Sequence, residues 1–394
     1  MRTIYFDNNA TTRVDPAVFE EMRPYFTELY GNPSSMHTFG GQVARKLAEA
    51  RERVAELLGA DPSEIVFTSC GTEGDNTAIR SALEAQPEKR HVVTTRVEHP
   101  AVLNLVNHLI KKGYHVTLLG VDEQGMIDLQ ELEDSLRDDT AVVSIMWANN
   151  ETGTVFPVER AAEIVKSRGI LFHTDAVQAV GKVPIDLRSL PIDFLVLSGH
   201  KLHAPKGVGA MYVRKGTPYR PFLIGGHQER GRRGGTENVP GIIALGKACE
   251  LARQHMDEEN TRVRALRDRL EKGLLASVPD TRLNGHPTER LPNTVNLSFK
   301  YVEGEAILLL LDQIGVCASS GSACTSGSLE PSHVLRAMGV PFTFAHGSVR
   351  FSLSRFNTEE EVDFVVAEMP KIIERLRSIS PFSEEHEPSS VGAC

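Results

Sequence analysis

The chain has 394 residues, of which 41% are hydrophobic and 24% are charged, and its formal net charge is −9. A chain of this length is too long to fold around one compact core, so we expect two domains. The composition excludes the disordered and the fibrous classes of protein. Acidic and basic residues are mixed, so we expect no nucleic-acid partner. No apolar run has the length of a membrane span and the N-terminus lacks a signal-peptide core. We therefore expect a cytoplasmic protein without a membrane partner.

Five cysteines are scattered along the chain, and no two of them form a C-x-x-C pair. Their odd number and their spacing predict neither a disulfide framework nor a zinc site, so we expect no intrinsic metal. At least one of them is a candidate reactive thiol. The five are Cys70, Cys249, Cys317, Cys324 and Cys394.

Short apolar runs alternate with amphipathic segments of helix length through the middle of the chain. This pattern is typical of βα units around a mostly parallel sheet, and the apolar spacing of each helix suits packing on that sheet. The fold class is therefore α/β. The expected strands are 64–69, 91–95, 116–119, 141–147, 170–174, 194–198 and 209–213, and the expected helices include 38–58, 101–112 and 158–168.

The pattern changes after about residue 241 and predicts a second, smaller α+β domain. Its expected elements are a long charged helix at 242–277, segments 293–299, 303–313 and 348–354, and a last helix at 359–379. We expect a large domain at 15–257, a small domain made of 1–14 and 258–380, and a polar tail at 381–394 that carries Pro, Ser and Glu.

Polar residues follow three consecutive strands of the expected sheet, in segments 148–153, 175–178 and 199–201. Ligands of open α/β sheets bind at the carboxyl ends of the strands, so these segments are expected to share one crevice. Lys201 there is either a solvated lysine or a desolvated amine that forms a Schiff base. Asp175 is either a helix cap or a carboxylate for a ring nitrogen. The two together fit pyridoxal 5'-phosphate (PLP), which requires both groups.

Two further segments are candidates for contacts with the same cofactor. The turn at 70–76 opens a helix whose N–H groups favour an anion, although an ordinary strand-to-helix turn has the same pattern. His99 either stacks on a pyridine ring or is an ordinary polar residue.

The second half of the chain adds a thiol and a guanidinium. Segment 318–328 consists of small residues without apolar periodicity, which predicts a mobile loop of about 318–330 with Cys324 near its centre. Cys324 is either a reactive thiol or an incidental cysteine of a Gly/Ser linker. Arg350, on an expected strand, either binds a substrate carboxylate bidentately or forms a structural ion pair.

Segments along almost the whole chain resemble the aminotransferase class V family, and specifically cysteine desulfurases of the NifS/IscS type. They are 5–12, 31–35, 198–201, 234–236, 319–326 and 350–354. Segment 319–326 resembles the long nucleophile loop of group I desulfurases, whereas group II members and selenocysteine lyases have a short, different segment. The resemblance implies the PLP-dependent transferase fold type I, aspartate-aminotransferase-like, with a mostly parallel seven-stranded sheet in a large PLP-binding domain and a smaller α+β domain.

The resemblance also implies the roles of individual residues around the ring. Lys201 would carry the cofactor, Asp175 would pair with the pyridine nitrogen, His99 would stack over the ring, and Gln178 would donate to the ring oxygen. Asn150 resembles the second ring-oxygen contact, with the neighbouring Asn149 as the alternative.

Phosphate and substrate contacts follow from the same resemblance. The expected phosphate contacts are Gly71, Thr72, Ser198, His200 and, from a second subunit, Thr236, so that a homodimer is implied. Gly199 is a further expected cofactor-binding residue. Arg350, helped by Asn32, would bind the carboxylate of L-cysteine. The segment 70–74 departs from the Gly-Ala-Thr-Glu-Ser form of housekeeping members, which leaves the individual phosphate hydrogen bonds open.

The implied activity converts L-cysteine to L-alanine and leaves a persulfide on Cys324, which would pass sulfur to an iron–sulfur scaffold of the NifU/IscU kind and transiently ligate a nascent cluster. Segments 146–152 and 201–206 resemble the nitrogen-fixation branch of the family. We therefore expect the enzyme to supply sulfur for the maturation of nitrogenase. The alternatives are a housekeeping donor for iron–sulfur clusters and tRNA thiolation, a selenocysteine lyase, an aminotransferase, or a sulfur-carrier scaffold without catalysis.

Overall fold

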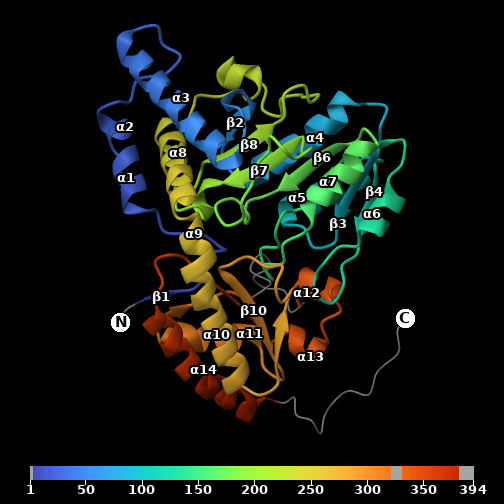
Figure 1. Cartoon of the computed structure of the whole chain (residues 1–394), viewed down its shortest axis with the longest axis vertical. Coiled ribbons are helices and arrows are strands. Elements are labelled where there is room, and N and C mark those ends of the chain that lie inside the picture. Colours follow the sequence, from blue (N-terminus) through green and yellow to red (C-terminus); the bar gives the residue numbers. More distant parts are fainter. Residues whose placement is uncertain (1–2, 321–330, 381–394) are drawn as a thin grey trace.

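The computed structural model describes residues 3–320 and 331–380 (Figure 1). Its largest sheet has seven strands in the order β2-β8-β7-β6-β5-β3-β4. Strand β8 runs antiparallel to β2 and β7, and the remaining pairs are parallel. The strands are β2 (Ile65–Thr68), β3 (His91–Thr95), β4 (His115–Leu119), β5 (Thr140–Ser144), β6 (Leu171–Asp175), β7 (Phe194–Ser198) and β8 (Gly209–Val213). The predicted α/β class and mostly parallel seven-stranded sheet are confirmed.

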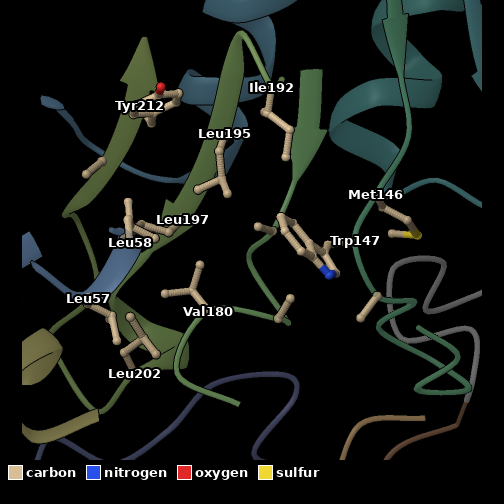
Figure 2. Packing of buried hydrophobic residues seen from close by; sticks show 14 of the residues in the cluster. Leu57, Leu58, Met146, Trp147, Val180, Ile192, Leu195, Leu197, Leu202 and Tyr212 are labelled. Carbon is tan, nitrogen blue, oxygen red and sulfur yellow. The ribbon is translucent and has the colours of Figure 1, made fainter. Parts of the chain in front are cut away.

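Helices bury both faces of this sheet. Neighbouring residues of one strand point to opposite faces, so Ile65 and Phe67 belong to one apolar cluster and Val66 belongs to another. The face of Val66 packs against α4 (Gly71–Ala85) and α5 (Pro100–Lys111). The opposite face packs against α3 (Thr38–Leu58), α7 (Val158–Ser167) and α8 (Val239–Gln254). Figure 2 shows part of this second cluster, around Trp147, Leu195 and Leu197.

Shorter helices complete this part of the chain. They are α1 (Pro16–Met22), α2 (Pro24–Thr27) and α6 (Leu129–Ser135), together with 3₁₀ turns at Pro62–Glu64, Gly199–Lys201 and Gln228–Gly231. The turn Gly199–Lys201 directly follows β7, so the backbone of Lys201 is fixed at the carboxyl end of a strand whose residues are all buried. The predicted position of Lys201 at a strand end is confirmed.

A second apolar core lies below the sheet in Figure 1. It surrounds a three-stranded antiparallel sheet in the order β12-β10-β9. Ile4 and Phe6 from the N-terminus join this core, because β1 (Ile4–Tyr5) pairs in parallel with β11 (Val316–Cys317). Its other elements are β9 (Thr281–Asn284), β10 (Thr294–Phe299), β12 (Ser348–Ser352), α10 (Arg264–Ser277), α11 (Gly304–Gln313) and α14 (Glu359–Ile379). The short helices α12 (His333–Ala337) and α13 (Phe342–Ala345) precede β12, and their buried apolar residues belong to the first cluster. The domain boundaries stay a prediction.

The predicted continuous helix at 242–277 is wrong. Helix α8 ends at Gln254 with His255 as its C-cap, and α9 (Met256–Glu258) and a π-helical turn (Glu259–Val263) precede α10. Asn260 Nδ2 donates to the carbonyl oxygens of Lys182 and Met256, at 2.9 and 3.0 Å, which draws this turn toward the first part of the chain. Such π turns are local insertions that a 3.6-residue periodicity does not reveal.

Within residues 3–320 and 331–380, no helix combines the length and the apolar character that crossing a membrane requires.

Candidate active site

A cavity of about 480 Å³ lies where β5, β6 and β7 end. Strand ends and helix starts from both halves of the chain contribute to its wall, as the sheet topology predicts. Most of the residues proposed from the sequence meet there. They are Gly71, Thr72, His99, Asn150, Asp175, Gln178, Ser198, His200, Lys201 and Arg350.

The amine of Lys201 is held by the N-terminal segment. Its Nζ donates to the carbonyl oxygens of Asn9 and Ala10, at 2.5 and 2.7 Å. Burial lowers the pKa of Lys201 to about 8, and the positive charges of Arg350 and Lys182 act in the same direction. A lysine with such a pKa has a substantial neutral fraction at physiological pH and is suited to act as a nucleophile or a base.

Asp175 is the last residue of β6 and is buried in the same cavity. Its Oδ1 accepts a hydrogen bond from the backbone N–H of Val177 at 2.9 Å. Burial raises the pKa of Asp175, while the charges of His99 and Lys201 oppose this effect. A cationic ring nitrogen placed beside the carboxylate would stabilise its ionised form for the same electrostatic reason.

His99 caps helix α5, and this fixes its tautomer. Its Nδ1 accepts a hydrogen bond from the backbone N–H of Ala101 at 3.1 Å, so the proton of the neutral imidazole is on Nε2. Burial lowers the pKa of His99 below its ordinary value, and the positive charge of Lys201 also lowers it. His99 therefore presents a neutral ring with one N–H donor.

The start of α4 fits a phosphate. Cys70, the N-cap residue, makes no side-chain cap hydrogen bond, which leaves backbone N–H groups for an anion. A Cβ atom at Gly71 would lie 2.9 Å from Cγ2 of Val177, so only glycine fits between this helix start and the turn after β6. Thr72, Ser198 and His200 line the adjoining wall.

Only one of the two polar side-chain atoms of Gln178 has a hydrogen-bond partner among the described residues. Its Nε2 donates to the Asn9 carbonyl oxygen at 3.0 Å, while its buried Oε1 has no partner among the described residues. Together with the amine of Lys201, the carboxylate of Asp175 and the open start of α4, this donor set fits PLP. PLP would supply the electron sink that this chain's side chains lack.

Arg350 projects from β12 into the cavity and is 3% exposed. Its Nη1 donates to the Asn150 carbonyl oxygen and its Nη2 to Asp7 Oδ1, both at 2.9 Å. Its buried Nε has no partner among the described residues. Arg350 thus forms the ion pair considered above, and its guanidinium is part of the cavity wall.

Asn149 and Asn150 differ in their surroundings. Asn149 is 1% exposed; its Oδ1 accepts from the N–H groups of Glu151 and Thr152, and its Nδ2 donates to the Val97 carbonyl. Asn149 is therefore used to shape the loop, whereas Asn150 lines the cavity. This geometry favours Asn150 for the ring contact, and its role stays a prediction.

Three proposed residues do not line the cavity in the single chain. Gly199 is buried in the turn after β7, where its N–H donates to the Val208 carbonyl at 2.9 Å. Asn32 is exposed, and its Oδ1 accepts from Ser34 N at 2.9 Å. Thr236 lines a different cavity, beside Glu229 and Arg233. Roles for Asn32 and Thr236 would require a second copy of the chain.

Cys324 lies outside the described residues, but both described ends of its segment reach the site. Ser319 forms a backbone bridge with Arg350. On the other side, Pro331, Ser332 and His333 line the cavity, and the Ser332 hydroxyl donates to Glu151 Oε2. The described chain is therefore next to Arg350 before this segment and in the cavity wall after it.

Several other residues of the cavity wall had no role predicted from the sequence. Asn9 and Ala10 lie within the family-like segment 5–12, so that resemblance could have found them. Five more lie within segments 70–76, 148–153 and 175–178, which were expected at the site: Cys70, Asp75, Ala148, Glu151 and Val177. No local pattern marks the other six, because tertiary contacts bring them in. They are Pro100, Met146, Pro331, Ser332, His333 and Arg336.

Comparison with known proteins places the chain in a family. Residues 4–365 match the family described as aminotransferase class-V. The chain belongs to the aminotransferase class V family.

Members of this family with similar sequences and structures carry related names. The chain is 65% identical to "Cysteine desulfurase 2" of Trichormus variabilis, over 98% of this chain and 96% of that protein. It is 62% identical to "Cysteine desulfurase NifS" of Azotobacter vinelandii, over 97% of this chain and 95% of that protein. A solved structure titled "NIFS-LIKE PROTEIN" is 43% identical, with a TM-score of 0.90 over 95% of this chain and 100% of that chain.

Proposed function

We propose that the chain is a PLP-dependent cysteine desulfurase, which converts L-cysteine to L-alanine and transfers the sulfur to Cys324 as a persulfide. One observation supports this most strongly. The cavity that holds Lys201, Asp175 and Arg350 is also lined by residues 331–333, which directly follow the segment that contains Cys324. The desulfurase names of relatives that match nearly the whole chain support the same function.

The cofactor would be held by the residues whose free groups fit it. Lys201 would bind it covalently, Asp175 would pair with its ring nitrogen, and Gln178 and Asn150 would face its ring oxygen. The open start of α4 at Gly71 would hold the phosphate. When bound, PLP supplies an electron sink for the carbanion that forms at the substrate.

Three side chains would bind the substrate, accept its Cα proton and stack on the cofactor ring. The guanidinium of Arg350, which lines the cavity, would bind the substrate carboxylate and orient the amino acid. Lys201, whose pKa is lowered to about 8 chiefly by burial, would accept the proton from Cα once the substrate has taken its place on the cofactor. His99 would stack on the ring as a neutral imidazole.

Transfer of sulfur from cysteine requires a thiolate. This thiolate has to reach the cavity first and the surface of a partner protein afterwards. Cys324 is four residues beyond Ser320, and one extended residue spans ~3.3–3.6 Å, so the short tether allows such a reach. The accepting partner would be an iron–sulfur scaffold protein of the NifU/IscU kind. The sulfur would be used in the maturation of nitrogenase, and the similarity to "Cysteine desulfurase NifS" of Azotobacter vinelandii supports this role.

A homodimer is the proposed assembly. Thr236 is exposed and away from the cavity of its own chain, so a second chain would have to supply it. We place the enzyme in the cytoplasm, where thiols stay reduced, since the three cysteines of the described residues are free.

The decisive experiment incubates the purified, PLP-loaded protein with L-cysteine and a reductant, and measures alanine and sulfide together. Desulfuration yields equal amounts of the two. Amino-group transfer would instead consume cysteine without alanine, and a sulfur-carrier scaffold would produce neither product. Either result would overturn the proposed function.

A further inference from the structure

The cavity contains a second histidine whose hydrogen bonds are the reverse of those of His99. His333 is the first residue of α12, and its Nε2 lies 3.0 Å from the carbonyl oxygen of Glu98. A carbonyl oxygen only accepts, so Nε2 carries the proton. In the neutral imidazole, Nδ1 therefore bears a lone pair.

Several groups act on the protonation of His333. Burial lowers the pKa of His333 from its ordinary value, the positive charge of Arg336 lowers it further, and the hydrogen bond to Glu98 opposes them. His99 is close enough for the charge of His333 to lower its pKa as well. The buried carboxyl of Glu98 has a pKa raised to about 8, mainly by burial, so it adds little negative charge at neutral pH. His333 is therefore neutral under physiological conditions.

The lone pair of His333 is available within the cavity. Among residues 3–320 and 331–380, no donor forms a hydrogen bond with Nδ1 of His333, and His333 lines the cavity wall. Glu98 and His99 are consecutive, so His333 is hydrogen-bonded to the residue that directly precedes His99. His99 offers an N–H group, and His333 offers an acceptor.

The position of His333 in the cavity wall suits a contact with the substrate sulfur. His333 lines the same cavity as Arg350 and Lys201, which would bind the carboxylate and the amino group of cysteine. The side chain of bound cysteine would then face other residues of this wall, and His333 is one that offers an acceptor. An acceptor for a thiol proton is useful at this place, because a thiol loses its proton when its sulfur becomes a persulfide anion.

We propose that His333 is a further catalytic residue, whose Nδ1 accepts a hydrogen bond from the thiol of bound cysteine and takes its proton during sulfur transfer. This inference rests on the proposed desulfurase function. An S–S bond forms between the accepting thiolate and the substrate sulfur, and the Cβ–S bond breaks with its electron pair going to the substrate carbon. The thiol proton goes to Nδ1, and an equivalent proton completes the methyl group of alanine. Thiolate and cysteine thus give persulfide anion and alanine without another oxidant or reductant.

The test uses His333→Gln in the PLP-loaded enzyme. The amide N–H₂ of glutamine can still donate to the Glu98 carbonyl and its oxygen can still accept a hydrogen bond, but glutamine cannot take the proton. The substrates are L-cysteine and L-selenocysteine. A selenol is far more acidic than a thiol and is already ionised at neutral pH, so its cleavage does not need this base. His108→Gln, an exposed position on α5, is the matched control.

For cysteine, H333Q is expected to lower kcat/KM at neutral pH about 10²-fold, the size of a lost general base. In the plot of kcat/KM for cysteine against pH, H333Q should lack one of the ionisations that the wild type shows on the acid side. The kcat/KM for selenocysteine and the absorbance of the bound cofactor should stay near those of the wild type, and H108Q should match the wild type throughout.

Two results would overturn the proposal. Equal losses with both substrates would mean that His333 only anchors α12, and an unchanged rate and pH profile with cysteine would mean that its nitrogen takes no proton. A wild-type enzyme that forms no alanine would refute the proposed function itself, which is a separate outcome.

Discussion

Ser319 and Arg350 exchange both of their backbone hydrogen bonds. Arg350 N donates to the Ser319 carbonyl at 2.7 Å, and Ser319 N donates to the Arg350 carbonyl at 3.1 Å. The guanidinium proposed to bind the substrate carboxylate is therefore bridged to the residue from which the segment of Cys324 departs. Strand β12 thus positions both the guanidinium of Arg350 and the backbone of Ser319, which precedes the segment of Cys324.

Replacing Arg350 by Lys should weaken cysteine binding. Lysine keeps the charge but loses the Nε–H donor and the planar fork. A charged hydrogen bond contributes ~1.5–3 kcal/mol, so KM for cysteine should rise by about 10- to 100-fold. Steady-state kinetics measure this change. The matched control is Arg267→Lys, a buried arginine of α10 away from the cavity, which should alter stability without raising KM. An unchanged KM in R350K would contradict the proposed carboxylate contact.

Replacing Cys324 by Ala should abolish alanine formation from cysteine, because no thiolate then accepts the sulfur, while PLP still binds with unchanged absorbance. Mass spectrometry of the wild type after one turnover should find the added sulfur on the peptide with Cys324. Cys317→Ala, on β11, should remain active.

The competing acceptor is Cys70, the thiol of the described residues that lines the cavity. A fully active C324A enzyme that loses activity on Cys70→Ala would transfer the role to Cys70.

Lys201 should titrate near pH 8 in the cofactor-free protein. Burial and the charge of Arg350 disfavour the ammonium form, so the amine becomes reactive well below the ordinary lysine range. Labelling with an amine-directed reagent at several pH values, read by mass spectrometry of the peptide, measures this. The extent of labelling of the exposed Lys215, measured in the same sample, is the internal control for a solvated amine. Arg350→Gln should raise the midpoint for Lys201, and a midpoint equal to that of Lys215 would refute the desolvation argument.

The sequence predicts the central sheet well because six of its seven strands, all but the edge strand β4, are buried on both faces. The ranges of β3, β7 and β8 agree residue for residue with the structure, and both ends of α3 and α14 do so as well. The strand expected at 141–147 ends earlier, at Ser144. Beyond it, Met146 N turns to Glu98 Oε1 and leaves the pairing with β3.

The site was predictable where residues follow strand ends. Asp175 and Lys201 are of this kind, because parallel strands bring their carboxyl ends together whatever the rest of the fold does. The carbonyl of Asn9, which holds Lys201 from 192 positions away, and the imidazole of His333 depend on tertiary contacts that no local periodicity encodes. Contacts of this range require coordinates.

The buried carboxyl of Glu98 should make stability depend on pH. Its Oε1 accepts from Met146 N and Thr95 Oγ1, both at 2.9 Å, and its Oε2 has no partner among the described residues. Burial raises the pKa of Glu98 from 4.5 to about 8 in the folded protein. Because the folded pKa is above the unfolded one, the stability from this group is complete below 4.5 and is lost as pH rises through about 8.

Glu98→Gln removes this titration while its amide oxygen can still accept both hydrogen bonds. The free energy of unfolding of the wild type minus that of E98Q should fall by ~1.4 kcal/mol per pH unit between these two pKa values. Urea unfolding of the cofactor-free proteins, at several values from about pH 5 to about pH 8, measures the difference. The exposed Glu88→Gln should track the wild type at every pH. If the difference for E98Q stayed constant over this range, Glu98 would be ionised in the fold, and the neutral surroundings inferred for His333 would be wrong.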